Sequence, residues 1–461
     1  MSSGNATSRA GLKVRVFSAA LQGHPEVTLQ GRRRAAQRTI ADIAAAIAPA
    51  SPVGTEQEQQ AAADIVSAVR QRGDAAVLEY TRLFDWPRAT AAGLRVRPRE
   101  IEEAQRSISS RTRKALATAI ERIRNFHQVR KPSDWLQIGP DGAVLGHRFT
   151  PVDSAAVYVP AGTAPLPSSL IMGAVAAQVA GVPRIVVATP PRRDGTINPV
   201  MLATAGLLGL KEIYKAGGAQ AIAALAFGTK TIPAVDKITG PGIVYVQIAK
   251  RMVFGQVGID GLYGPSELVI LADDSANPHW LAADLAAQAE HVPVAGPGPV
   301  VALVTPSRRL LTATAAALHR HVKQFGSAVR RSIEQAGALV HVKSLDQGAD
   351  LVNLLAPEHL QVSTRNPLAI LPKIRHAGCI VMGHWSTVPV GDYLAGPNHL
   401  LPTGRSARFS SGLSAAEFMK ASSVIGISAD WLAKYGPTVR HLATLEGLTA
   451  HAQAVAVRER K

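Results

Sequence analysis

The sequence predicts an α/β protein with two incomplete Rossmann-like domains, each built on a parallel sheet, and smaller N- and C-terminal helical parts. Three observations indicate this class. From residue 155 onward, short β-branched runs alternate with alanine-rich stretches, and a second such series begins at Glu267. Such alternation is typical of parallel sheets covered by helices on both faces. The length of 461 residues also exceeds what one small core can organise.

The chain is expected to divide into five parts. Amphipathic helices give way to strand–helix alternation near residue 150, and the two alternating series meet near residues 255–265. After residue 405 the pattern is again helical. The expected parts are an N-terminal extension (1–50), a helical N-terminal region (51–150), a first Rossmann-like α/β domain (151–262), a second Rossmann-like α/β domain (263–385), and a C-terminal loop and helical tail that contacts a partner subunit (386–461).

Local patterns predict the individual elements. Leu116, Ile120 and Ile123 form one apolar stripe of a helix, and Gly73 ends another helix before Asp74 caps the next. The predicted helices are 39–50, 56–72, 75–83, 111–129, 168–180, 199–208, 219–227, 278–290, 308–324 and 346–355. The predicted strands are 155–159, 184–188, 212–215, 268–271, 300–304, 338–342 and 379–382.

Composition limits the functional classes. Cys379 is the single cysteine, so no intrachain disulfide can form, and this fits a cytoplasmic location. The longest uncharged stretch, 154–183, is interrupted by prolines, and no signal peptide is visible, so no membrane partner is expected. The formal charge of +17 is widely spread, with only residues 32–34 tightly clustered. Without a zinc-finger spacing or an RNA-binding motif, no nucleic-acid partner is expected either.

Four short polar islands in the C-terminal part supply candidate functional groups. They are Gln288-Ala-Glu-His291, Ala-Pro-Glu358-His359, Gly391-Asp392-Tyr393 with the nearby Asn398-His399, and Glu446-Gly-Leu-Thr-Ala-His451. Their nitrogen and oxygen donors suit a divalent metal such as zinc or manganese. Glu358 and His359 stand apart from this donor set and suit proton transfer. Metal ligands together with an acid/base pair favour an enzyme.

Each island taken alone is also typical of ordinary structure. Gln288 and His291 are expected on one face near a helix end, where capping and surface histidines are common. Glu358 follows a proline, as at the charged start of a turn or helix. Asp392 suits an Asx turn in its Gly-rich loop. A tail histidine such as His451 is most often simply solvated.

Three Gly-rich segments are candidates for contact with a dinucleotide. Gly217-Gly218 follows a predicted strand and opens a predicted helix, which is a good place for a phosphate. The other two are Tyr158-Val-Pro-Ala-Gly162 and Gly240-Pro-Gly242. No G-x-G-x-x-G fingerprint occurs, and glycine and proline at strand ends are routine in α/β folds. These segments alone leave dinucleotide binding open.

Taken together, the islands resemble the histidinol dehydrogenase family in order and spacing. The segments Tyr263-Gly-Pro-Ser266-Glu, Gly217 to Leu225 and Ala407 to Leu413 add to a likeness that covers roughly residues 55–458. The resemblance implies a homodimer of subunits with two incomplete dinucleotide-type domains. It also implies oxidation of L-histidinol through L-histidinal to L-histidine, the last steps of histidine biosynthesis, with zinc and two NAD.

The resemblance also implies a role for each matching residue. The implied ligands of one zinc ion per subunit are Gln288, His291, Asp392 and, donated by the partner subunit, His451. His359 would remove the alcohol proton, and Glu358 would activate the water that adds to the aldehyde. The implied substrate-binding residues are Ser266, Gln288, His291, His359, Asp392, His399, Glu446 and His451. The positions implied to contact NAD are Tyr158, Gln220 and Ile243.

The cofactor side of the chain departs from the family pattern. Ile243 stands where an asparagine usually contacts NAD, and its side chain offers no hydrogen bond. Ala161 replaces a usual glycine, Tyr263 a usual small residue, and Val292 a common acidic residue. The longer N-terminus is a further departure. These changes leave the metal and acid/base set intact and bear on NAD affinity and substrate choice.

Two other functions remain to be distinguished. A related zinc and NAD enzyme would act on another polar alcohol, such as a sulfonated diol. Glu446 favours histidinol, because a carboxylate suits a cationic imidazole or amine and opposes a sulfonate. A zinc hydrolase would also need a metal and a Glu-His pair but no NAD, so NADH formation separates the two classes.

Overall fold

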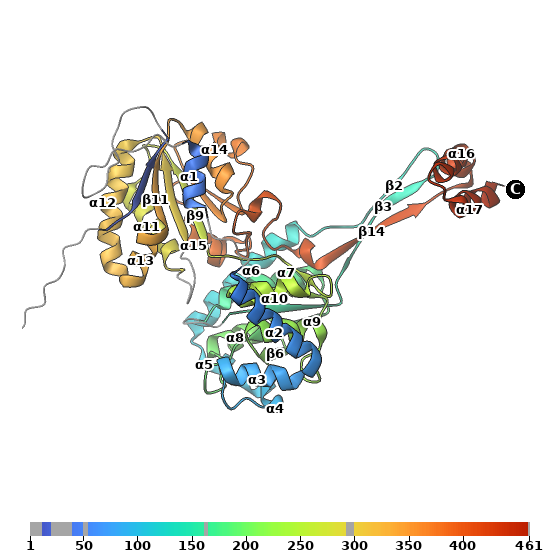
Figure 1. Cartoon of the computed structure of the whole chain (residues 1–461), viewed down its shortest axis with the longest axis horizontal. Coiled ribbons are helices and arrows are strands. Elements are labelled where there is room, and N and C mark those ends of the chain that lie inside the picture. Colours follow the sequence, from blue (N-terminus) through green and yellow to red (C-terminus); the bar gives the residue numbers. More distant parts are fainter. Residues whose placement is uncertain (1–11, 20–38, 49–53, 161–164, 292–298, 460–461) are drawn as a thin grey trace, which may run out of the picture.

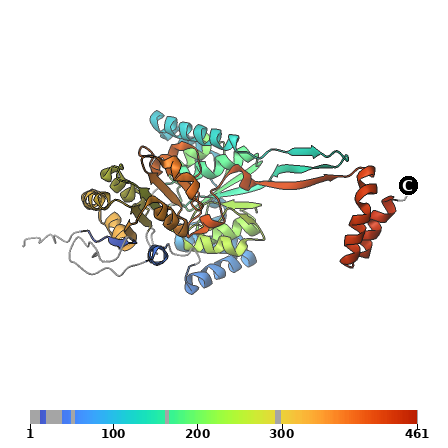
Figure 2. The same cartoon turned by 90° about the horizontal axis from the view of Figure 1, so that it is seen from above.

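The computed structural model describes residues 12–19, 39–48, 54–160, 165–291 and 299–459. Two parallel sheets with helices on both faces form the body of the protein (Figure 1). A narrow antiparallel ribbon carries the last helices away from this body, as both views show (Figure 1, Figure 2). The expected α/β class with two parallel-sheet domains is confirmed.

The first sheet has the order β6-β5-β4-β7-β8 and is entirely parallel. Its strands are β4 (Ser154–Tyr158), β5 (Arg184–Thr189), β6 (Glu212–Lys215), β7 (Lys237–Thr239) and β8 (Gly258–Ile259). The helices that cover it are α7 (Pro167–Ala180) and α8 (Pro199–Leu207) on one face, and α2 (Glu56–Arg72), α9 (Gly218–Phe227) and α10 (Val244–Val253) on the other. Every residue of β4 is buried, because both faces of this central strand are covered.

The strand order of this sheet reverses between β4 and β7. Ligands of open α/β sheets bind outside the carboxyl ends of the strands at such a point. Tyr158 ends β4, and Gly240 directly follows β7. The two segments approach so closely that a Cβ on Gly240, whose φ is +117°, would clash with the Tyr158 carbonyl oxygen. Glycine at this position therefore lets the two strand ends meet.

The second sheet repeats the strand order of the first sheet and has one additional outer strand. Its six parallel strands run β1-β11-β10-β9-β12-β13. They are β1 (Arg15–Ser18), β9 (Glu267–Ala272), β10 (Val300–Thr305), β11 (Gly337–His341), β12 (His359–Ser363) and β13 (Cys379–Met382). Its covering helices are α11 (Pro278–Ala289), α12 (Arg308–Phe325) and α13 (Ser327–Ala336) on one face, and α1 (Ile40–Ile47) and α14 (Leu345–Leu355) on the other. Apart from β1, both sheets thus share one topology.

The N-terminal segment adds the outermost strand of the second sheet. β1 pairs in parallel with β11, from Arg15 opposite Ala338 to Ser18 opposite His341. The helix expected over 39–50 is confirmed as α1, which packs on α14. The described residues among the first 50 therefore belong to the second sheet and its cover, although an extension was expected there. The rest of that extension lies outside the described residues.

The helical region before the first sheet packs against the helices that cover that sheet. It contains α3 (Asp74–Phe84), α4 (Ala91–Leu94), α5 (Pro98–Ser107) and α6 (Ser110–Val129). Gly73, with φ +55°, ends α2 as expected. α5 packs on α8, and α6 packs on α7. The predicted helices 56–72, 75–83 and 111–129 are confirmed to within a residue at each end.

A projecting arm, defined here as residues 135–151 and 419–459, joins the N-terminal region to the C-terminus. It contains the antiparallel strands β2 (Trp135–Ile138), β3 (Val144–Pro151) and β14 (Met419–Gly426), and the helices α16 (Ala429–Leu445) and α17 (Thr449–Glu459). The expectation that the chain is only helical after residue 405 is wrong, because β14 pairs with β3 over eight residues. α17 begins at Thr449, after the turn at Gly447. Within the described part of the chain, no helix is long and apolar enough to span a membrane.

Candidate active site

The candidate active site lies at the amino ends of β9 and β12, which are adjacent strands. Ser266 precedes β9, and Glu358 precedes β12. Ser266 Oγ donates a hydrogen bond of 2.6 Å to Glu358 Oε2. α11 runs back from the carboxyl end of β9, so its last turn places Gln288 at the same edge, where Gln288 Nε2 donates to Ser266 Oγ at 2.5 Å. Residues of two islands, Gln288 and Glu358, are thus linked through Ser266 by hydrogen bonds.

His359 is the first residue of β12 and continues this chain of contacts. The expected helix or turn at Glu358-His359 is wrong, because Leu360 and Val362 pack into the core of the second sheet at strand spacing. His359 Nδ1 lies 3.1 Å from the Glu267 carbonyl oxygen and 3.4 Å from Glu358 Oε2. A carbonyl oxygen only accepts, so Nδ1 carries the proton in this contact and Nε2 is the atom left to exchange protons.

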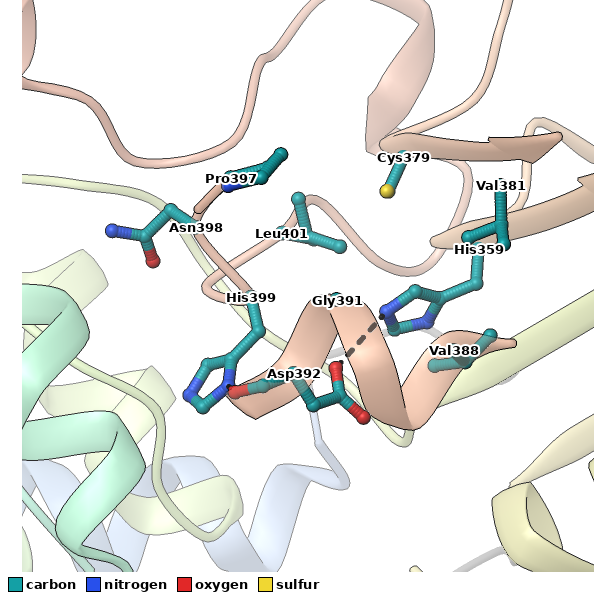
Figure 3. Close-up of a pocket in the computed structure, with 10 residues that line it drawn as sticks. All are labelled: His359, Cys379, Val381, Val388, Gly391, Asp392, Pro397, Asn398, His399 and Leu401. Atoms are coloured by element: carbon teal, nitrogen blue, oxygen red, sulfur yellow. Dashed lines mark hydrogen bonds and ion pairs between the residues drawn. The ribbon is translucent and has the colours of Figure 1, made fainter. Parts of the chain in front are cut away.

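Asp392 approaches His359 from the opposite side (Figure 3). It lies in the π-helical turn η3 (Gly391–Ala395), and its Oδ1 stands 3.7 Å from His359 Nε2. Burial opposes a charge on His359, but the carboxylates of Glu358 and Asp392 raise the pKa of this histidine well above its usual value. Burial likewise opposes ionisation of Asp392, but hydrogen bonding and charge from His359 lower the pKa of Asp392. The pair is therefore electrostatically complementary.

His399 and His291 complete the surroundings of Asp392. His399 Nδ1 lies 2.9 Å from the backbone oxygen of Asp392, and His399 Nε2 lies 3.2 Å from Ser169 Oγ on α7. His291 follows α11 and does not lie on it, so the expected shared helix face with Gln288 is wrong. Its charge nevertheless acts on Asp392 and favours the ionised carboxylate. The first domain thus contributes to the site through α7.

His359, Asp392 and His399 border a small pocket with a volume of about 220 Å³, which includes space open to solvent. Figure 3 shows His359, Asp392 and His399 around it, with Cys379 and Leu401 on other parts of its wall. Its wall therefore mixes titratable groups with apolar side chains. Such a lining is typical of a site for a small molecule.

Glu446 and His451 lie elsewhere in the chain. Both are exposed, on the arm at the end of α16 and in α17. Figure 1 shows these helices at the far end of the arm. Among the described residues, no group of three or more His, Cys, Asp and Glu side chains is gathered in a metal-binding arrangement. One chain therefore links Gln288, Ser266, Glu358, His359, Asp392 and His399 by contacts, but does not bring these two residues to them.

The predicted cofactor residues lie at the carboxyl edge of the first sheet. Tyr158 is buried, and its hydroxyl oxygen accepts a hydrogen bond of 3.1 Å from the Gly218 nitrogen. Gln220 in α9 is 1% exposed, and neither atom of its side-chain amide has a partner among the described residues. Ile243 precedes α10, is 54% exposed and gives the helix no side-chain cap. An orphaned buried amide beside a glycine turn is unusual and points to a ligand there.

Comparisons with known proteins identify the family. The histidinol dehydrogenase family profile matches residues 50–459. This chain belongs to the histidinol dehydrogenase family. It is 48% identical to a histidinol dehydrogenase of Geobacillus kaustophilus over 88% of this chain and 95% of that protein. It is 47% identical to one from a Synechococcus strain over 86% and 91% of the two chains.

A solved structure supports the same assignment. The crystal structure of histidinol dehydrogenase from Elizabethkingia anophelis matches with a TM-score of 0.87 and 32% identity, over 98% of this chain and 99% of that chain. The expected resemblance, the fold class and the enzyme class, an oxidoreductase of the histidinol dehydrogenase type, are confirmed. The match extends through the arm, because nearly all of both chains is covered.

Several residues around this histidinol dehydrogenase site were not predicted from the sequence. Glu267 contacts the Glu358 backbone, and Thr403 Oγ1 accepts a hydrogen bond from the Gly264 nitrogen. Ser169 and His127 support the His399 segment from α7 and α6. Glu267 could have been found from the sequence, since it stands in the segment 263–267 that resembles the family. The others belong to segments without polar clustering, so only the fold reveals their position.

His127 yields a pH-dependent prediction for stability. It is 1% exposed, and its Nε2 lies 3.5 Å from Asn398 Nδ2, next to His399. Burial, aided by Arg130, lowers the pKa of His127 from 6.5 to about 4. The unfolded chain then binds this proton more tightly, so the stability from neutral His127 is complete above pH 6.5 and is lost as the pH falls through 4. The loss approaches about 3 kcal/mol.

The measurement compares unfolding temperatures between pH 7 and pH 4. His127→Gln is expected to be less stable at pH 7 and to lose less stability than the parent protein on acidification. His441→Gln, on exposed α16, serves as the control and should follow the parent. Parallel curves for the parent and His127→Gln would contradict the prediction.

Proposed function

We propose that this chain is a zinc- and NAD-dependent dehydrogenase that oxidises L-histidinol through L-histidinal to L-histidine. One observation carries the proposal beyond family membership. A continuous chain of polar contacts runs from Gln288 through Ser266, Glu358 and His359 to Asp392. These residues come from three islands and from the segment that contains Ser266, and they meet at one edge of the second sheet. The arrangement places a proton-transfer pair directly beside metal-ligand types.

The donor set fits zinc. Gln288, His291 and Asp392 would hold the ion together with His451 of the partner subunit. Amide oxygen, imidazole and carboxylate are suitable ligands, and the absence of a thiolate in the set is compatible with a catalytic ion. Bound zinc would orient the amine and imidazole of the substrate, and its charge would offset the carboxylate of Asp392.

His359 and Glu358 perform the proton transfers in this proposal. His359 is held by the Glu267 carbonyl oxygen through Nδ1, so its Nε2 would take the alcohol proton, and NAD, when bound, would supply the hydride acceptor. In the second oxidation, Glu358 activates a water that supplies the second carboxyl oxygen. Glu358 is buried and already accepts hydrogen bonds from Ser266 and the Glu267 nitrogen, which fix its orientation.

In this proposal NAD binds at the carboxyl edge of the first sheet. Its strand order reverses between β4 and β7, where Tyr158 and the Gly240–Gly242 segment meet. The orphaned amide of Gln220 and the glycine turn at Gly217-Gly218 follow β6, two strands away from β4, and the Gly218 nitrogen donates a hydrogen bond to the Tyr158 hydroxyl. Ile243 is exposed at the start of α10, so it would contribute apolar contact and no hydrogen bond. NAD would therefore be held mainly by backbone groups and shape.

The arm supports the proposal of a homodimer with shared active sites. Apolar side chains remain exposed along it, including Ile138 at 74% and Leu445 at 70%. Contiguous exposed apolar residues mark an interaction surface. A second copy of the chain that covers this surface would bring the partner's His451 and the partner's Glu446 toward the site of the first subunit.

The test is a steady-state assay with L-histidinol, a sulfonated diol and a small panel of other alcohols, each with NAD or NADP. The expected result is formation of two NADH per L-histidinol, lost on chelation and restored by zinc. Preference for the sulfonated diol would favour the alternative substrate class. Hydrolysis of an ester or amide without NADH formation would overturn the dehydrogenase mechanism.

A further inference from the structure

Glu267 and Glu358 hold each other through their backbones. The Glu267 nitrogen donates to Glu358 Oε2 at 2.8 Å, and the Glu358 nitrogen donates to Glu267 Oε2 at 3.1 Å. These two hydrogen bonds join Glu267, the first residue of β9, to Glu358, which directly precedes β12. The other oxygen of Glu267, Oε1, accepts from the Gly404 nitrogen at 2.6 Å. One buried carboxylate therefore fastens two separate segments to the start of β9.

Both fastened segments contain strained backbone. Among the described residues, the non-glycine residues with positive φ are Ala356 at +46° and Arg405 at +67°. Ala356 stands two residues before Glu358, and Arg405 directly follows Gly404. The left-handed region is sterically unfavourable for an L-residue other than glycine, and such strain persists only where surrounding contacts enforce it. The bonds to Glu267 lie next to both strained positions.

We propose that Glu267 is a positioning residue that sets the place of the Glu358-His359 pair. Its carboxylate fixes the Glu358 nitrogen and Gly404, while its carbonyl oxygen fixes His359 Nδ1. The inference rests on the proposed function of that pair in proton transfer. Glu267 itself is 1% exposed and faces backbone amides, so it acts through its neighbours and not on the substrate.

Burying the carboxylate of Glu267 costs free energy, which the hydrogen bonds to it must offset. Burial, together with the charge of Glu358, raises the pKa of Glu267 to about 8, against the opposing effect of the Gly404 hydrogen bond. Two acidic side chains side by side in a buried sheet edge are unfavourable without compensation. The compensation here comes from donors that belong to the segments being positioned.

The experiment compares Glu267→Gln with Asp273→Asn. Glutamine keeps the size but presents an N–H group to one of the two backbone donors, so one bond is lost. Asp273 follows β9 at the end opposite the site, and it accepts hydrogen bonds from the Ser275 and Arg365 nitrogens. It therefore links β9 to the segment after β12 at a place remote from the site. Glu267→Gln is expected to lower kcat by roughly 10- to 100-fold, with zinc content retained and KM for NAD little changed. Asp273→Asn is expected to retain kcat.

Amide hydrogen exchange gives a readout independent of activity. Glu267→Gln should accelerate exchange in peptides that contain Glu358 and Gly404, and Asp273→Asn should accelerate it near Arg365 instead. Unchanged exchange at Glu358 and Gly404 overturns the positioning role, whatever the substrate is. Failure of the proposed function would instead appear as a parent protein that forms no NADH from L-histidinol.

A double-mutant cycle with Glu358→Gln completes the test. If Glu267 acts through the pair, Glu267→Gln should add little to the loss already caused by Glu358→Gln. Fully additive losses would overturn the proposal. Glu267→Asp, which keeps the charge but is shorter, serves if the glutamine variant does not fold. Global unfolding of both variants would show a purely structural role and would also overturn it.

Discussion

Replacing His359 with asparagine is expected to lower kcat for L-histidinol oxidation by roughly 10²- to 10⁴-fold, the usual contribution of a positioned general base. Asparagine can still donate to the Glu267 carbonyl oxygen, so β12 should keep its place. It has no group that titrates near neutral pH, so no side chain at this position can take the alcohol proton. NADH formation under saturating substrate measures the effect.

Metal content decides what such a loss means. The proposed ligands Gln288, His291 and Asp392 are untouched by His359→Asn, so the variant should bind zinc as the parent does. Loss of zinc would show that His359 is a ligand and not a base. His376→Asn is a matched control, because His376 lies in the connection between β12 and β13 and uses its backbone nitrogen, which donates to Asn353.

Mixing two inactive variants is expected to restore activity if the arm completes the site of a partner subunit. His359→Asn damages the site of its own subunit, whereas His451→Asn damages the site to which its arm reaches. In a mixed dimer, one site carries both defects and the other carries none. Random reassociation makes half of the dimers mixed, so about a quarter of the parent activity should return.

The control for this experiment is a mixture of His359→Asn with Glu358→Gln. Both changes lie in the same part of the site, so no mixed dimer contains an intact site and activity should stay low. Restored activity is measured by NADH formation after joint refolding or co-expression. A fully active His451→Asn variant, or no recovery on mixing it with His359→Asn, would contradict the shared-site arrangement.

Much of the fold could be predicted from the sequence because its helices and central strands carry strong patterns. Strands such as β5 and β10 are apolar on both faces, and their helices repeat alanine and leucine at helical spacing. β12 escaped prediction because His359, Gln361 and Ser363 place polar side chains in a fully buried strand. Their partners come from distant segments, such as Asp284 for Gln361. A local pattern does not contain that information.

The candidate site could likewise be predicted from the sequence only in part. The islands indicated which residue types gather, since the donors and the Glu-His pair were visible in the sequence. Their spacing did not show how they gather. Gln288 reaches the site because α11 runs antiparallel to β9, and His399 reaches it through contact with α7 of the first domain. The reciprocal bonds of Glu267 and Glu358 depend on strand adjacency, which the order β9-β12 creates across a long connection.

The arm described above is nearly all surface. α16 buries only Gly436 and Ala443, and α17 buries no described residue fully. A helical hairpin on a thin ribbon has too small a core to hold its geometry by itself. If its tip supplies a ligand to another subunit, catalytic competence becomes a property of concentration: dilution that separates the subunits would switch the enzyme off before either main domain unfolds.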